Sequence, residues 1–158
     1  MTGLLQFAAV SLAFIVGFFG TTVAGAAEPE LMAALSVSGY GYRVKVFVNG
    51  IDVGVDGGKS EGRRLFNKGN AMAAKASAAV RAKNFVLNAG VNEFVIEYAK
   101  TDPKGTDALE IKLEAEGYAQ PLFKLTNRNK VSDKLSIKVT IANPAPKDFM
   151  PQVITEGK

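Results

Sequence analysis

The chain of 158 residues contains no cysteine, no histidine and no tryptophan. Without cysteine it forms no disulfide, carries no thiol nucleophile and accepts no lipid on a thiol. Without cysteine and histidine together it lacks the usual ligands of zinc and the imidazole base of a Ser-His-Asp triad. These absences exclude cysteine proteases, thiol oxidoreductases, zinc enzymes and triad hydrolases, and we expect no cofactor.

Charged side chains are missing from residues 1–27. Residues 4–19 form an apolar run, small residues follow up to Ala27, and the polar Glu28 comes next. This order is typical of a secretory signal segment, here expected as an N-terminal helix, with its cleavage site after small residues. We therefore expect a periplasmic or secreted protein. The alternative is an uncleaved anchor, because about 20 apolar residues span a bilayer.

Residues 28–158 are enough for one domain with its own core. The 19 basic and 15 acidic residues of the chain give a net charge of +4, and they mostly alternate along the sequence. Nucleic-acid-binding proteins instead cluster lysine and arginine on one face, so we expect no nucleic-acid partner. Contact with a membrane is expected only through the N-terminal segment, if it stays uncleaved.

Alternation of apolar and polar residues dominates the sequence after the apolar segment, which is typical of strands with one buried face. The segments with this alternation, or with short apolar runs between turn residues, are 31–37, 42–48, 84–87, 93–99, 109–116, 122–125 and 135–141. Segments 84–87 and 93–99 flank Gly90 and predict a hairpin. The pattern predicts an all-β fold, an antiparallel β-sandwich of the jelly-roll or immunoglobulin-like kind with about seven or eight strands. A closed barrel is the alternative.

One segment, 71–82, is rich in alanine and does not alternate. Alanine favours helix and Asn70 suits the N-cap, so we predict one short helix, with a flexible loop as the alternative. We expect a signal peptide or anchor over 1–27 and the sandwich domain over 28–143. The proline-rich residues 144–158 are expected to form an extended tail.

Two segments resemble known sandwich modules. Residues 46–54 (VFVNGIDVG) and 85–96 (FVLNAGVNEFVI) are similar to the strand-turn and hairpin patterns of galactose-binding-like and carbohydrate-binding modules, and immunoglobulin-like domains use similar turns. The resemblance implies a β-sandwich and a glycan as an alternative partner. Such modules stack an aromatic ring on the sugar, and Tyr40 and Tyr42 are the candidate platform. Alternatively, both rings belong to the core or to strand ends.

Three motifs suggest chemistry, each with a structural alternative. Ser60 stands in GKSEG (58–62), which fits the G-x-S-x-G elbow, but only a lysine could act as its base. Carboxylates such as Asp102, Asp107, Glu110, Glu114 and Glu116 could form an acid/base pair, or simply cover a solvated strand face. We expect no metal; the best candidates for calcium ligands are Asp52, Asp56, Ser60 and Glu61, although their spacing is not that of an EF-hand and they also suit turns.

We expect a non-catalytic interaction module that docks on another exported or envelope protein. Its expected contact lies in the loop 52–68, where Arg63, Arg64 and Lys68 stand beside Leu65 and Phe66. Arginine next to apolar anchors is typical of interfaces. Alternatively, Leu65 and Phe66 belong to a further strand. A carbohydrate-binding module, or a hydrolase that uses carboxylates or Ser60, are the alternative functions.

Overall fold

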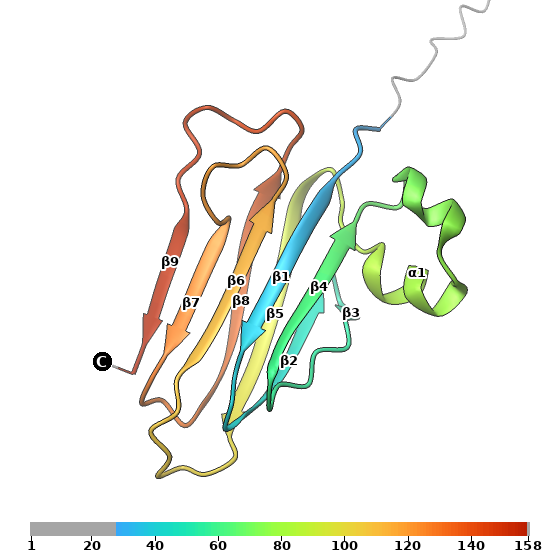
Figure 1. Ribbon diagram of the computed structural model, residues 1–158. Coiled ribbons are helices and arrows are strands. Elements are labelled where there is room, and N and C mark those ends of the chain that lie inside the picture. The colour runs from blue at the N-terminus through green and yellow to red at the C-terminus, as the bar shows by residue number, and fades with distance from the viewer. Residues whose placement is uncertain (1–27, 158) are drawn as a thin grey trace, which may run out of the picture.

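The computed structural model describes residues 28–157 as two β-sheets packed face to face (Figure 1). The predicted all-β sandwich is confirmed, and the predicted signal segment, 1–27, lies outside the described residues. The strands are β1 (Met32–Ser38), β2 (Tyr42–Val48), β3 (Ile51–Asp52), β4 (Ser60–Phe66), β5 (Gly90–Lys100), β6 (Leu109–Ala115), β7 (Phe123–Asn127), β8 (Ser132–Ile141) and β9 (Gln152–Glu156). The helical elements are a short 3-10 helix, η1 (Ala71–Lys75), and α1 (Ala78–Asn84). None of the helices described is long and apolar enough to cross a bilayer.

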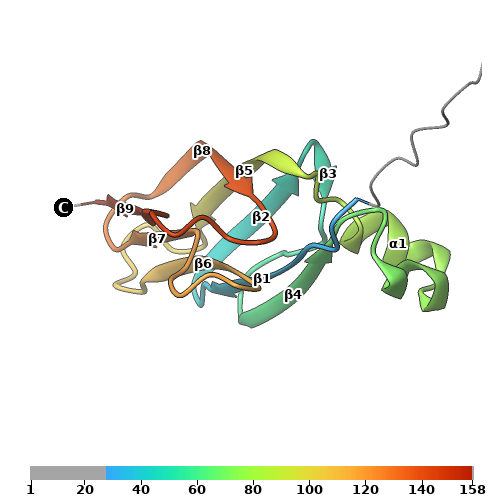
Figure 2. The same cartoon turned by 90° about the horizontal axis from the view of Figure 1, so that it is seen from above.

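The five-stranded sheet has the order β4-β1-β6-β7-β9, and the four-stranded sheet has the order β3-β2-β5-β8. All neighbours are antiparallel except β7 and β9, which run parallel. The parallel pair arises because the chain leaves β8 in one sheet and crosses the end of the sandwich before it enters β9 in the other (Figure 2). A crossover of this kind is what parallel pairing requires. The described sandwich has nine strands, of which β3, β4 and β9 lie outside the predicted segments.

The core lies between the two sheets and follows the predicted alternation. In β2, Val44 and Val46 are buried while Lys45 between them is exposed; in β6, Ile111 and Leu113 are buried in the same way. Each such side chain contributes about 1.5–3 kcal/mol through burial. Strand boundaries at these two segments agree with the prediction to within one residue.

The predicted hairpin strand 84–87 is not formed. Asn84 ends α1, and Leu87 makes only an isolated parallel bridge to Asn67. Residues 85–87 are nevertheless buried, because they anchor the chain to the core as it returns from the helices. A short apolar run that plugs a core has the same pattern as a buried strand, so the sequence does not distinguish them.

The alanine-rich segment is helical, as predicted, but divided into two. The Asn70 side chain accepts a hydrogen bond from Met72 N (3.0 Å) and caps η1, and Ser77 Oγ accepts one from Val80 N (3.3 Å) and caps α1. Neither helix has a buried residue. We call residues 71–84 the helical excursion; it lies at one end of the sandwich beside β4 (Figures 1 and 2).

The C-terminal segment is extended, and part of it joins a sheet. β9 pairs with β7, and before it Phe149 packs edge-on against Tyr118, with ring centroids 4.8 Å apart. A domain limit at residue 143 therefore leaves out the last strand of the five-stranded sheet.

Candidate docking surface

Leu65 and Phe66, which were expected at the contact with a partner, belong to strand β4. Leu65 is fully buried in the core, and Phe66 stacks on Phe85 with ring centroids 5.0 Å apart. The structure thus agrees with the alternative in which Leu65 and Phe66 belong to a strand, and Leu65 cannot reach a partner. Arg64 and Lys68 are exposed. β4 escaped prediction because polar residues occupy both of its faces until Leu65.

Arg63 fastens the loop before β4. Its Nη2 donates to the Gly54 carbonyl oxygen at 2.6 Å and lies 3.8 Å from Glu61 Oε2. The Glu61 side chain is largely covered, and neither Glu61 Oε1 nor Arg63 Nε has a hydrogen-bond partner in the described part of the chain. Reversing the charge of Arg63 would therefore disturb the fold as well as any binding.

A second cation reaches the same place from α1. A Cβ atom built on Gly54 would lie 3.2 Å from Lys83 Nζ and 3.8 Å from Arg63 Nη2. The two positive groups therefore converge on Gly54 from different elements. Among the residues described, the ion pairs found include Arg63 but not Lys83. Because Lys83 adds a positive charge beside Arg63, whose only ion pair within residues 28–157 is the 3.8 Å contact with Glu61, this place favours a negatively charged ligand.

The overall balance of basic and acidic residues conceals the uneven charge of residues 62–92. This run holds no acidic residue and six basic ones, and we call these six the basic end: Arg63, Arg64, Lys68, Lys75, Arg81 and Lys83. Fewer acidic groups approach it from elsewhere, and two of them, Glu114 and Glu116, line one hollow together with Arg64. Glu30 Oε1 accepts from Ala71 N at 3.0 Å, Glu28 lies near Gly69, and Glu61 pairs with Arg63. Positive charge remains in excess, and the run without acids is the sequence signal that could have identified this surface.

The two tyrosines of the expected platform do not face the same side. Tyr42 is fully buried, its hydroxyl donates to the Asp107 carbonyl oxygen and accepts from Asn127 Nδ2, both at 3.2 Å, and burial raises its pKa. Tyr40 is 58% exposed in the turn before β2. Of the candidate pair, only the Tyr40 ring is exposed. Tyr42 belongs to the core, as the alternative interpretation had it.

The calcium candidates are used within the loop. Asp52 Oδ1 accepts from Gly54 N at 2.7 Å, and burial together with a hydrogen bond to Asp56 raises the pKa of Glu61. A carboxyl group whose pKa is raised is less suited to bind calcium, because the cation needs ionised oxygens. No group of three or more acidic side chains in the described residues is arranged to hold a metal. Ser60 begins β4 opposite Ser38, which is not the strand-to-helix turn of a nucleophile elbow.

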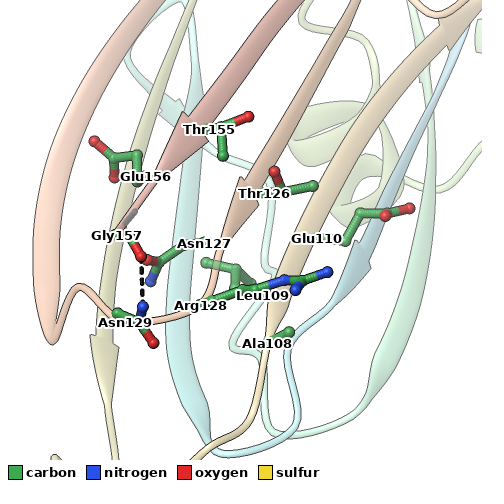
Figure 3. A pocket seen from close by; sticks show the side chains of 10 residues that line it. All are labelled: Ala108, Leu109, Glu110, Thr126, Asn127, Arg128, Asn129, Thr155, Glu156 and Gly157. Carbon is green, nitrogen blue, oxygen red and sulfur yellow. Dashed lines mark hydrogen bonds between the residues drawn. The ribbon is translucent and has the colours of Figure 1, made fainter.

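The carboxylates of β6 face outward and pair with lysines. Glu110 lies 2.8 Å from Lys124 Nζ, and Glu114 lies 3.1 Å from Lys112 Nζ. Glu110 also lines a hollow of about 470 Å³ at the ends of β6, β7 and β9 (Figure 3). One wall of this hollow is closed by the hydrogen bond from Asn129 Nδ2 to the Gly157 carbonyl oxygen, at 2.7 Å. Paired in this way, these carboxylates match the solvated-face interpretation.

Beside that hollow, a partly buried hydrogen bond holds the last strand. The Tyr98 hydroxyl bonds Glu156, and Lys130 Nζ lies 3.1 Å from the same carboxylate and also pairs with Asp133. Burial, followed by the bond to Glu156, raises the pKa of Tyr98, so the hydroxyl keeps its proton. β9 is thus fixed at its end, and the basic end stands at the opposite edge of the same sheet.

Comparison of the chain with protein-family models, with curated proteins and with solved structures finds no match.

Proposed function

We propose that this protein is a non-catalytic module that acts in the periplasm or outside the cell and docks on an acidic surface of another exported protein. The basic end is its contact. The helical excursion is the observation that carries this proposal, because it is ordered, contributes no buried residue and presents Lys75, Arg81 and Lys83. Elements that a rigid scaffold displays without using them in its core are typical of binding sites.

Electrostatics gives this surface its selectivity. Lys83 and Arg63 converge on Gly54, so one partner carboxylate placed there would interact with both. Each exposed ion pair contributes only about 0–1 kcal/mol, so recognition depends on several pairs acting together. We therefore expect a partner with a cluster of Asp and Glu, and association that steepens as salt is lowered.

A protein fits this surface better than a lipid bilayer. The exposed apolar side chains of the excursion are alanines together with Met72 and Val80. Helices that insert into a membrane interface present a broad apolar face with Trp, Phe or Leu, which this segment lacks. Small methyl groups, in contrast, let another polypeptide approach the helix backbone closely.

Several features support a role without catalysis. Histidine and cysteine are absent from the chain, Ser60 lies in a strand, and Glu110 and Glu114 are paired with lysines. The glycan alternative is weakened by the burial of Tyr42, which leaves Tyr40 without a second ring. These observations favour docking over either alternative function.

A photo-cross-linking residue placed at Ala79, which is exposed on α1, tests this proposal. We expect a cross-link to an exported protein, and loss of that cross-link in the double variant Arg81→Glu/Lys83→Glu. The matched control is Lys104→Glu/Lys147→Glu, which changes the net charge equally at exposed sites outside the basic end. Equal loss in both variants, or loss in neither, would contradict the proposal. Binding to anionic phospholipid vesicles with no cross-linked protein would assign the basic end to a membrane instead.

A further inference from the structure

The four sheet edges of the described sandwich differ in how they are protected. β3 has only two residues, β4 carries Glu61, Arg63 and Arg64, and β8 carries charged residues along its length. Charged side chains and short strands prevent pairing with another chain. β9 has neither protection on its outer face, where Val153 is 70% exposed and Thr155 is exposed. It is the one edge of the described sheets that is open to strand addition.

The backbone of β9 shows which groups are free. Gln152 N donates to the Leu122 carbonyl oxygen at 3.1 Å, and β9 pairs in parallel with β7. In a parallel ladder, alternate residues direct both their N–H and C=O groups to the same neighbour. Gln152, Ile154 and Glu156 therefore face β7, while Val153 and Thr155 direct their backbone groups to the open side. Figure 1 shows β9 as the outermost strand of its sheet.

We propose that β9 is a self-association site, on which β9 of a second copy pairs in antiparallel register centred on Ile154. In this register Val153 of each copy faces Thr155 of the other. Opposed residues of this type exchange both of their backbone hydrogen bonds. The pairing therefore satisfies the free N–H and C=O groups of Val153 and Thr155 in both copies.

The side chains suit the same register. Ile154 packs against the core but is only partly buried, because no strand follows β9, and Ile154 of the second copy would cover its open side. Gln152 would face Glu156, so no like charges are opposed. Glu156 is already hydrogen-bonded to Tyr98 and Lys130, which removes its need for water. Cross-strand pairs of β-branched residues, such as Val with Thr, are favourable.

Self-association through β9 would join the two five-stranded sheets into one continuous sheet. The paired segment is short, and interfaces well below about 1,200 Å² are typical of weak association. We therefore expect a reversible dimer with a dissociation constant in the range of about 10 μM to 1 mM. An extended segment of an unrelated protein is the other conceivable occupant, and the experiment separates the two.

Sedimentation velocity of the exported protein over a series of concentrations tests this inference. We expect a monomer–dimer equilibrium, with slower amide hydrogen exchange at Val153 and Thr155 as concentration rises. Val153→Pro removes only an outward N–H, which proline at a strand edge tolerates, and should weaken the dimer about tenfold or more. Val153→Lys places a charge on the edge and should have the same effect, with an unchanged far-ultraviolet spectrum. The matched control is Val91→Lys, an exposed valine on β5.

A protein that stays monomeric at millimolar concentration, or a dimer that both Val153 variants leave intact, would overturn the proposal. Protection of Val153 and Thr155 that requires a different polypeptide would assign the edge to that polypeptide and would equally overturn self-association. The basic end plays no part in this experiment, so its outcome leaves the proposed docking function untouched.

Discussion

At the scale of single residues, Glu61 lies near Asp56, at the start of the strand from which Arg63 holds the preceding loop. Burial and the bond to Asp56 raise the pKa of Glu61 above its ordinary value of 4.5. The folded state therefore binds this proton more tightly than the unfolded chain does. Near neutral pH the ionised Glu61 costs stability, and that cost disappears as the pH falls through its raised pKa.

We accordingly expect Glu61→Gln to stabilise the protein near neutral pH. The amide can donate to Asp56 without taking up a proton, while the lost ion pair with Arg63, at 3.8 Å, is worth little. Because wild-type Glu61 becomes protonated in acid, the gain should shrink toward about pH 4. Denaturant unfolding at the two pH values measures this difference. Glu110→Gln, at an exposed pair with Lys124, serves as the control and should change stability little at either pH. A loss of stability near neutral pH that shrinks in acid would instead show that ionised Glu61 stabilises the fold.

Residue-level prediction succeeded where local conformation decides the outcome. Asn49 and Gly50 both have positive φ, of 50° and 80°, as the Asn-Gly dipeptide before β3 suggests. The sequence does not predict that Asn92 is buried, because one partner of its side chain, Asn49, lies 43 positions away along the chain. It accepts from Asn49 Nδ2 (2.9 Å) and Asn88 N (2.7 Å) and donates to Asn88 and Gly90 carbonyl oxygens. From sequence alone a polar residue is predicted to be exposed, because burial requires hydrogen-bond partners that the sequence does not identify.

At the scale of secondary structure, strands with a regular solvent-exposed face were predictable, including β8 at an edge of the four-stranded sheet, whereas both edge strands of the five-stranded sheet were not. β2 and β6 alternate cleanly, since each lies within its sheet and has one face to solvent. β4 and β9 occupy the two edges of the five-stranded sheet and are partly polar on both faces. Their pairing depends on neighbours far away in the sequence, which local patterns cannot encode. The candidate docking surface was half predicted: Arg63, Arg64 and Lys68 were named, but the helical excursion became part of it only through the fold.

The helical excursion allows an element-scale prediction. Asn67 and Leu87 form a bridge, so the two ends of the excursion return to neighbouring positions, and neither η1 nor α1 contributes to the core. Replacing residues 71–83 by a short Gly-Ser linker should therefore leave a cooperatively folded sandwich, with a loss of about 1 kcal/mol or less in the free energy of unfolding. The same variant should lose binding to poly-L-glutamate.

Chemical denaturation and a binding titration on one preparation check both statements. The linker variant keeps Asn70, whose side chain bonds the Leu31 carbonyl oxygen, and keeps Phe85, which stacks on Phe66. Loss of cooperative unfolding would mean that the excursion has a structural role that its exposure conceals. Unchanged binding to poly-L-glutamate would remove the excursion from the docking surface.

At the scale of the whole molecule, the two proposed surfaces lie at opposite edges of the five-stranded sheet. β4 and the excursion mark one edge and β9 the other, and the two views agree on this separation (Figures 1 and 2). A dimer joined through β9 would place one basic end at each extremity of a ten-stranded sheet. With strands about 4.8 Å apart, the two ends would stand about 45 Å from each other.

Such a dimer would bind a dense acidic surface through both ends and a short acidic peptide through only one. Val153→Pro should therefore weaken binding to immobilised poly-L-glutamate by about tenfold or more, because the second contact becomes bimolecular again. Binding of a soluble peptide of six glutamates should be unchanged, since the basic end is intact in each monomer. Surface plasmon resonance at high and low ligand density measures the first quantity, and fluorescence anisotropy measures the second. An equal effect on both ligands would mean that β9 and the basic end are coupled within one molecule, because bivalence acts only where two ends can be engaged together.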